Sequence, residues 1–172
     1  MTFFIRKIEP FDIEQLVEIE RSAAQAFLTV PDWAWIVNQS VLSHADHLEL
    51  IETGYSFVIL NLHQRVLGFL YALKRGEDFF IVEVDVRADV QKQGIGKQLI
   101  QHAIAFAQQE RFKYVTLTTF IDVIWNKPFY EKLGFEIIQN QSLAQYIQDT
   151  LDCEVVYGFN RKDRCAMRKK LE

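Results

Sequence analysis

Hydrophobic and polar residues alternate strictly in the middle of the chain and then change to a helical period. Residues 81–86, IVEVDV, carry valines on one face and two carboxylates, Glu83 and Asp85, on the other, which predicts a β-strand. From Ile95 to Ala107 apolar residues recur three or four positions apart, which predicts an amphipathic helix. A strand, a short turn and a long helix therefore follow one another without interruption.

The same two periods predict the elements on either side. Segments 55–62 and 66–74 are apolar β runs separated by three polar residues, which indicates a hairpin. The strand expected at 114–120 follows a strand and a helix, so it should lie parallel to the strand at 81–86 through a right-handed crossover. Further strands are expected at 3–9, 135–139 and 164–171, and further helices at 12–26, 43–51, 126–134 and 142–152.

The segment between the first two expected helices has no clean period. It carries Phe27, Pro31, Trp33 and Trp35 close together, so we expect a loop. Aromatic side chains on such a loop either pack against the protein or line a ligand pocket, and the sequence leaves both roles open.

The turn before the long helix is QKQGIG, residues 91–96. Because Gly94 and Gly96 have no side chains, a ligand can approach the backbone closely, and the first N–H groups of the helix have no partner inside it. The helix dipole, Lys92 and Lys97 all add positive charge there. The turn therefore predicts a site for a phosphate or pyrophosphate, although a helix start that only happens to contain two glycines is the alternative.

Spacing separates three known phosphate-binding turns. A dinucleotide fingerprint needs a third glycine where Leu99 stands, and a P-loop needs glycine at Gln91 and a hydroxyl residue at Gln98. The remaining pattern, Q-x-x-G-x-G after a strand, resembles the coenzyme A pyrophosphate loop of the GNAT superfamily of N-acetyltransferases.

A second segment, WNKPFYEKLGF at 125–135, resembles the other GNAT signature. That signature is a short helix that bears Asn and Tyr and ends in a Gly-Phe pair, here Gly134 and Phe135. The Trp-Asn-x-Pro-Phe-Tyr order is similar to one GNAT subgroup, for which no single acceptor can be named. The resemblance implies a single GNAT domain over residues 1–172. It also implies an α/β fold with a mixed, splayed sheet of about six to seven strands, flanked by about four to five helices.

The resemblance also implies where acetyl-coenzyme A binds. The coenzyme would lie between the strands at Ile81 and Tyr114, with its pantetheine arm paired to one strand and its pyrophosphate on the glycine turn. Asn126 would hydrogen-bond near the pantetheine, although capping of its own helix is an equal reading. The implied coenzyme-binding residues are Val84, Asp85, Val86, Gln91, Lys92, Gln93, Gly94, Ile95, Gly96, Lys97, Asn126 and Tyr130.

Acetyl transfer needs an acid for the leaving thiolate and a base for the amine. Tyr130 matches the family's general acid by position, and a phenol of pKa ~10 can protonate a thiolate whose thiol titrates near ~8.5. Packing against its aromatic neighbours is the alternative. The positions where relatives carry a basic carboxylate hold Thr118 and Phe80 here, which is a departure. Glu83 is the nearest substitute, against a solvent-facing or salt-bridged acid, a water chain or an already neutral amine.

The resemblance thus implies an enzyme that moves an acetyl group from acetyl-CoA to a primary amine by direct attack. The acceptor would be a small-molecule or peptide amine. Two alternatives stay open: a non-catalytic coenzyme A-binding sensor or interaction module, and an acyltransferase that uses a longer acyl-CoA.

Composition excludes several other classes. A formal net charge of −4 argues against nucleic acid as a partner, and no apolar run is long enough for a membrane span. The amino terminus lacks a secretory signal, so a cytoplasmic location is expected. His44 and His47 have no matched third ligand, so no metal is expected, and the two cysteines should be free thiols. A homodimer through the closing strand stays open.

Overall fold

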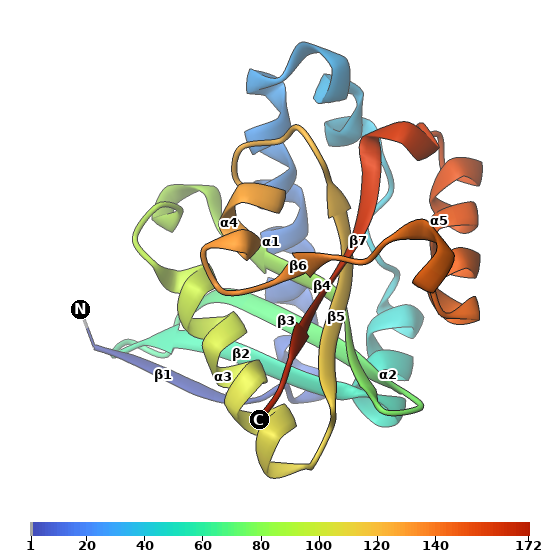
Figure 1. Cartoon of the computed structure of the whole chain (residues 1–172). Helices are drawn as coiled ribbons and strands as arrows, with labels where there is room; N and C mark the ends of the chain where they lie inside the picture. Colours follow the sequence, from blue (N-terminus) through green and yellow to red (C-terminus); the bar gives the residue numbers. More distant parts are fainter. Residues whose placement is uncertain (1) are drawn as a thin grey trace. The chain divides into compact units, whose positions relative to one another are not determined.

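The computed structural model describes residues 2–172, which form a mixed seven-stranded sheet with α-helices (Figure 1). The strand order is β1-β2-β3-β4-β5-β7-β6, and the expected mixed α/β fold is confirmed. The strands are β1 (Phe3–Lys7), β2 (Tyr55–Asn61), β3 (Val66–Arg75), β4 (Asp78–Val86), β5 (Tyr114–Phe120), β6 (Glu136–Ile137) and β7 (Arg164–Lys170). The α-helices are α1 (Ile13–Ala24), α2 (His44–Thr53), α3 (Ile95–Gln109), α4 (Lys127–Glu131) and α5 (Gln145–Val156).

The chain divides into two compact units, each with its own contacts. The first unit is the chain up to Leu73 together with Val82–Ala105, and the second unit is Lys74–Ile81 together with Phe106–Glu172.

In the first unit, an antiparallel meander packs against the apolar stripe of α1. β1 pairs with β2 from Phe3↔Asn61 to Lys7↔Phe57, and β2 pairs with β3. α1 buries Ile13, Leu16 and Ile19 in a cluster with β-strand side chains such as Phe69. This stripe follows the 3.6-residue period of the sequence, so the burial of one helix face explains why the segment folds as a helix here.

A bidentate ion pair fixes the start of α1. Arg6 of β1 donates to both carboxylate oxygens of Asp12, at 2.7 and 2.8 Å. Asp12 also accepts the backbone N–H of Glu9 at 2.9 Å, which completes a capping box before the helix. The buried aspartate is therefore satisfied on all sides and serves structure.

In the second unit, the first half of β4 lies parallel to β5, with Asp78 opposite Tyr114 and Phe80 opposite Thr116. The expected parallel pairing after the long helix is confirmed. β5 pairs antiparallel with β7 along its whole length, and β7 pairs with the edge strand β6. Helix α5 buries Ile147 and Leu151 against the sheet.

Several element boundaries differ from the sequence expectation. β4 begins at Asp78 and not at residue 81. The strand expected at 135–139 pairs only over Glu136–Ile137, because the chain enters a 3-10 turn at Asn140. The last helix begins at Gln145, since Leu143 and Ala144 are still extended.

The aromatic segment after α1 is ordered and not an irregular loop. It forms 3-10 helices over Gln25–Thr29 and Pro31–Asn38, the second with Pro31 in its first turn. Trp33 is buried and its ring lies 6.4 Å from that of Trp35. Packing is therefore an observed role of this segment.

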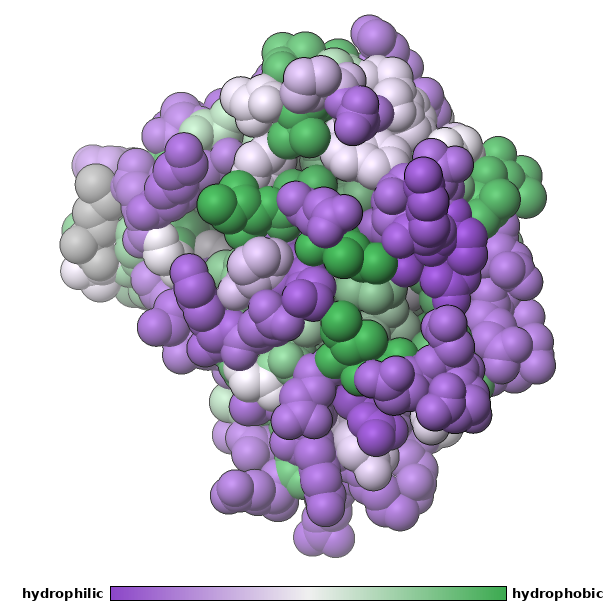
Figure 2. Space-filling model, turned by 45° about the horizontal axis from the view of Figure 1, so that its top comes forward, coloured by the Kyte–Doolittle hydropathy of each residue, from purple (hydrophilic) through white to green (hydrophobic). Residues whose placement is uncertain are grey.

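The surface is mostly hydrophilic with small separate apolar patches on the face shown in Figure 2. Strongly exposed apolar side chains include Phe11 in the first unit and Ile124 and Val156 in the second. Scattered exposure of this kind is ordinary for a folded chain. The homodimer therefore stays a prediction.

Candidate functional site

The turn between β4 and α3 contains a side-chain hydrogen bond and two left-handed residues. Gln91 folds its side chain back, and its amide nitrogen donates to the Val86 carbonyl at 3.0 Å. Lys92 and Gly94 both have positive φ, 61° and 82°. These two left-handed residues let the chain turn sharply between β4 and α3. The side chain of Gln91 thus holds in place a loop suited to a phosphate.

The start of α3 continues this positive surface. The Gly94 carbonyl accepts the N–H of Gln98 at 3.0 Å, so the amides of Ile95, Gly96 and Lys97 precede the first intrahelical bond. Ile95 is 1% exposed and anchors the turn in the core, whereas the side chains of Lys92 and Lys97 are exposed. The loop therefore presents backbone donors and two mobile cations around a fixed hydrophobic anchor.

The end of β4 brings two carboxyl groups together beside this loop. Glu83 and Asp85 are partly exposed yet lie deep among protein atoms, and burial raises the pKa of both. For Asp85 the pKa rises to about 8. Burial is the largest cause for both groups. The charge of Asp85 also raises the pKa of Glu83, and the charge of Glu20 raises the pKa of both. Burial and neighbouring carboxylates thus raise the pKa of both groups, and raised pKa values of this kind mark candidates for proton exchange.

Gly68 of β3 lets the two backbones approach closely at this point. A Cβ at residue 68 would lie 2.6 Å from the Asp85 carbonyl oxygen and 3.2 Å from a methyl group of Val86. The missing side chain is therefore a requirement of the strand arrangement that carries the carboxyl pair.

The sequence did not predict the contacts among three buried polar residues of the first unit. The Tyr71 hydroxyl lies 3.0 Å from His47 Nδ1, and His47 Nε2 lies 2.9 Å from Glu20 Oε1. Glu20 stands in the apolar stripe of α1, seven positions after Ile13, and this misplaced charge was a signal available in the sequence. Within residues 2–172, no group of three or more His, Cys, Asp and Glu side chains is arranged to hold a metal ion.

In the second unit, Tyr130 lies in helix α4 and Asn126 stands directly before the first residue of this helix. The Asn126 carbonyl accepts the N–H groups of Phe129 and Tyr130, at 2.9 and 3.1 Å, but its side chain makes no capping hydrogen bond. The predicted side-chain cap is therefore wrong, because at φ −110° and ψ −104° the backbone of Asn126 lies outside the usual extended cap conformation. Gly134, at φ 86°, ends the segment as expected.

Tyr130 is 7% exposed and packs among aromatic rings. Its ring meets Phe129 edge-on at 5.2 Å and Phe135 at 5.7 Å. The packing alternative is thus observed, while the general-acid role stays a prediction.

Thr118 and Phe80, the two positions at which the resemblance implies a carboxylate, make structural contacts. The Thr118 hydroxyl donates to Glu154 Oε1 of α5 at 2.6 Å, and Phe80 packs edge-on against Tyr146. Glu154 is in turn held by two Arg164 nitrogens, both at 2.7 Å. A carboxylate is therefore present beside Thr118, but a cation already neutralises it.

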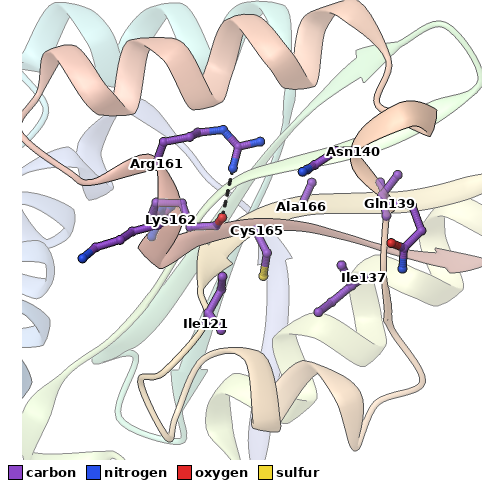
Figure 3. Close-up of a pocket in the computed structure, with 10 residues that line it drawn as sticks. Ile121, Ile137, Gln139, Asn140, Arg161, Lys162, Cys165 and Ala166 are labelled. Atoms are coloured by element: carbon purple, nitrogen blue, oxygen red, sulfur yellow. Dashed lines mark hydrogen bonds between the residues drawn. The ribbon is translucent and has the colours of Figure 1, made fainter.

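A cavity of about 270 Å³ lies within the second unit (Figure 3). Ile121, Ile137 and the thiol of Cys165 line it, together with Arg161, whose guanidinium donates to the Arg164 carbonyl at 3.2 Å. Cys153 and Cys165 are free, as expected, and burial raises the pKa of the Cys165 thiol. None of the residues predicted for the coenzyme site lines this cavity.

The structure thus brings the predicted residues together in two groups. Glu83 and residues 84–86 adjoin residues 91–97 in the first unit, and Asn126 adjoins Tyr130 in the second. That Tyr130 and Glu83 act on the same substrate stays a prediction.

Comparison with known proteins identifies the family to which this chain belongs. A model of the acetyltransferase (GNAT) family matches residues 14–135, which include the glycine turn and α4. Within residues 2–172, no helix is both long and apolar enough to cross a membrane.

Solved structures share the fold at low sequence identity. The PaiA N-acetyltransferase of Thermoplasma acidophilum, solved with coenzyme A, is 17% identical over 99% of both chains, with a TM-score of 0.72. The ribosomal-protein-S18-alanine N-acetyltransferase of Escherichia coli is 16% identical over 99% of this chain and 95% of that one, with a TM-score of 0.72. A phosphinothricin acetyltransferase of Sinorhizobium meliloti, solved with acetyl-CoA, is 16% identical over 99% and 89%, at 0.71.

Proposed function

The chain belongs to the acetyltransferase (GNAT) family, and from this premise we propose that it transfers an acetyl group from acetyl-CoA to an amine. The observation that carries the proposal is the loop of residues 91–97. Its positive φ angles at Lys92 and Gly94 and its position before α3 suit a pyrophosphate bound through backbone N–H groups.

In this proposal the end of β4 holds the reacting thioester. The backbone of Val84, Asp85 and Val86 pairs with the pantetheine arm, and an N–H of this segment stabilises the oxyanion of the tetrahedral intermediate. Asn126 contacts the pantetheine. The acceptor is a small-molecule or peptide amine.

Glu83 is the general base of the proposal. A base works best when its pKa lies near the working pH, and burial beside Asp85 raises the pKa of Glu83 in that direction. The amine transfers its proton to Glu83 as its nitrogen attacks the acetyl carbon. Tyr130 then protonates the coenzyme A thiolate as the C–S bond breaks, so charge is balanced at both ends.

The first experiment follows free thiol while the protein turns over acetyl-CoA with a panel of primary amines. Thiol release with at least one amine, matched by acetylated product, is expected. Calorimetric binding of acetyl-CoA without thiol release would favour the non-catalytic binding module instead. Comparison of acetyl, succinyl and longer thioesters tests the preference for a longer acyl group.

A matched glycine pair tests the loop itself. Gly94 and Gly76 both have positive φ, 82° and 62°, and in both cases an added Cβ meets nothing within 4 Å. Replacement by alanine therefore strains either backbone alike, by about 1–2 kcal/mol. Gly94→Ala should weaken acetyl-CoA binding about tenfold or more, because the loop must change its conformation, while Gly76→Ala should leave affinity unchanged. Equal affinities for the two variants would contradict the assignment of the loop.

A further inference from the structure

A row of three buried polar side chains runs through the first unit. Glu20 of α1, His47 of α2 and Tyr71 of β3 are 6%, 0% and 0% exposed. The second oxygen of Glu20 accepts the backbone N–H of Leu42 at 2.9 Å, which fixes its orientation. Removal of polar side chains from water costs free energy unless hydrogen bonds compensate it. A row of three such side chains is therefore expected to have a role in the protein.

The protons of this row can be assigned from its contacts. Burial, and then the charge of Glu83, raises the pKa of Tyr71, so its hydroxyl keeps its proton and donates to His47 Nδ1. The proton of a neutral imidazole then sits on Nε2, which faces Glu20 Oε1 at 2.9 Å. That contact is not aligned as a hydrogen bond, so both atoms keep unused hydrogen-bonding capacity. A further proton at His47 would go to Nδ1, the nitrogen that faces the Tyr71 hydroxyl.

The row continues toward the carboxyl pair of β4. β3 and β4 are neighbours in the sheet, and Tyr71 and Glu83 interact electrostatically. Glu20 likewise acts on both Glu83 and Asp85. The groups around the row therefore influence one another as one protonation network.

The charges that act on the row include several carboxylates. His47 faces Glu20 of α1 and interacts with Asp46 on its own helix, while Tyr71 interacts with Glu83, Glu20 and Asp12, the last of which is paired with Arg6. An imidazolium formed at His47 would lie beside the Glu20 carboxylate, and the ion pair with Glu20 would hold it.

We propose that Tyr71, His47 and Glu20 form a proton relay that stores the proton which the acceptor amine gives to Glu83. The relay rests on the proposed acetyl transfer. The three residues act through Glu83, so they are positioning residues and not catalytic ones.

The step balances without a co-reactant. The N–H bond of the amine breaks as its proton moves to the Glu83 carboxylate. That proton passes to the Tyr71 oxygen while the Tyr71 proton moves to His47 Nδ1, which leaves Glu83 as carboxylate, Tyr71 neutral, and an imidazolium beside the Glu20 carboxylate. After product leaves, the proton returns by the same route and is released to water from the partly exposed Glu83.

A pair of Tyr→Phe variants tests the relay. Tyr71→Phe removes the hydroxyl and keeps the ring that packs on Phe69 at 5.3 Å. Tyr146→Phe removes a hydroxyl of the second unit that donates to Asp78 at 2.5 Å, so it controls for loss of a tyrosine hydrogen bond. We expect Tyr71→Phe to lower kcat about tenfold to a hundredfold at neutral pH without changing KM for acetyl-CoA.

The pH profile separates a relay from a structural role. At alkaline pH hydroxide can take the proton directly from the partly exposed Glu83, so the deficit of Tyr71→Phe should shrink, while Tyr146→Phe should follow the wild-type profile. Wild-type kcat in Tyr71→Phe, or a deficit that is the same at every pH, would overturn the relay alone. A wild type that binds acetyl-CoA but acetylates no amine would instead overturn the proposed function, and the relay with it.

A second measurement does not depend on activity. The ¹⁵N spectrum of the His47 ring should show an acceptor-type Nδ1 and a protonated Nε2, and Tyr71→Phe should move the Nδ1 signal. The opposite tautomer, or a Nδ1 signal indifferent to Tyr71→Phe, would overturn the relay. Glu20→Gln, which keeps the shape of the side chain, should move the Nε2 signal and lower kcat in the same pH-dependent way.

Discussion

Each compact unit carries partly buried carboxylates, Glu83 and Asp85 in the first and Glu154 in the second, which differ in whether a cation compensates them. In the second unit, Glu154 is held by Arg164 and by the Thr118 hydroxyl, and the guanidinium lies 4.2 Å from the centre of the Phe120 ring. In the first unit, the charges that act on Glu83 and Asp85 are those of other carboxylates.

This difference separates structure from chemistry. A carboxylate that is bound by two nitrogens of an arginine is stabilised in its charged form, so it is a poor base. A carboxyl group whose pKa is raised by burial and by other carboxylates is a candidate for proton exchange. Glu154 places a carboxylate beside Thr118, but Arg164 neutralises this carboxylate, so it is a poor candidate for the base. The proposed base lies on β4.

The largest expected effect comes from Glu83→Gln, which removes the proposed base. We expect kcat to fall by about 10²- to 10⁴-fold, with little change in acetyl-CoA binding, because a general base contributes on that scale. The protein should stay at least as stable as wild type, since a destabilised carboxyl is lost. Steady-state kinetics and a thermal melt measure both quantities. Unchanged turnover would assign the base elsewhere.

Glu154→Ala breaks the compensated network and should act on stability instead. The side chains of Glu154 and Arg164 are 14% and 10% exposed, and loss of one partner from a buried pair costs about 3–5 kcal/mol. Urea unfolding should show this loss, while kcat below the melting temperature stays near wild type. Glu77→Ala is the control, because Glu77 and Lys113 form an ion pair in which both side chains are 62% exposed. If Glu154→Ala were as stable as the wild type, Glu154 would not have the structural role that distinguishes it from Glu83.

Tyr130→Phe asks whether the second unit contributes chemistry as well as packing. The phenyl ring preserves the contacts with Phe129 and Phe135 while the proton donor is lost. Turnover should fall roughly tenfold to a thousandfold with near-normal coenzyme binding, within the range of general-acid effects. Full activity in this variant would remove Tyr130 from the mechanism.

The smallest expected effect is a slope of stability with pH. The pKa of Asp85 in the folded protein is about 8, above its unfolded value, so the folded state binds more protons between those two values. Stability from this group is present at acid pH and is lost as pH rises toward 8, by no more than about 1.4 kcal/mol per pH unit. Asp85→Asn should flatten the curve of unfolding free energy against pH. A wild-type curve that rises over this interval would contradict the assignment.

Local signals allowed the glycine turn and α4 to be predicted from the sequence. Strand and helix periods located β4 and α3, and the spacing of Gly94 and Gly96 selected one kind of loop among three. Each of these features depends on residues close together in the chain, where periodicity and turn chemistry are informative.

Long-range contacts could not be predicted in this way. Glu20, His47 and Tyr71 come from three separate elements, and Thr118 meets Glu154 only because α5 packs near β5. The Asn126 cap failed for the opposite reason, since residue type favoured a contact that the local backbone does not make. Tertiary packing decides such contacts.

The glycine at position 68 limits how this chain can vary. Any side chain there would push the β3 backbone away from the Asp85 carbonyl, and with it the strand that bears both acids of the first unit. Substitution at this position is therefore barred by geometry, and a designer who transplants β4 into another protein must carry its glycine neighbour along.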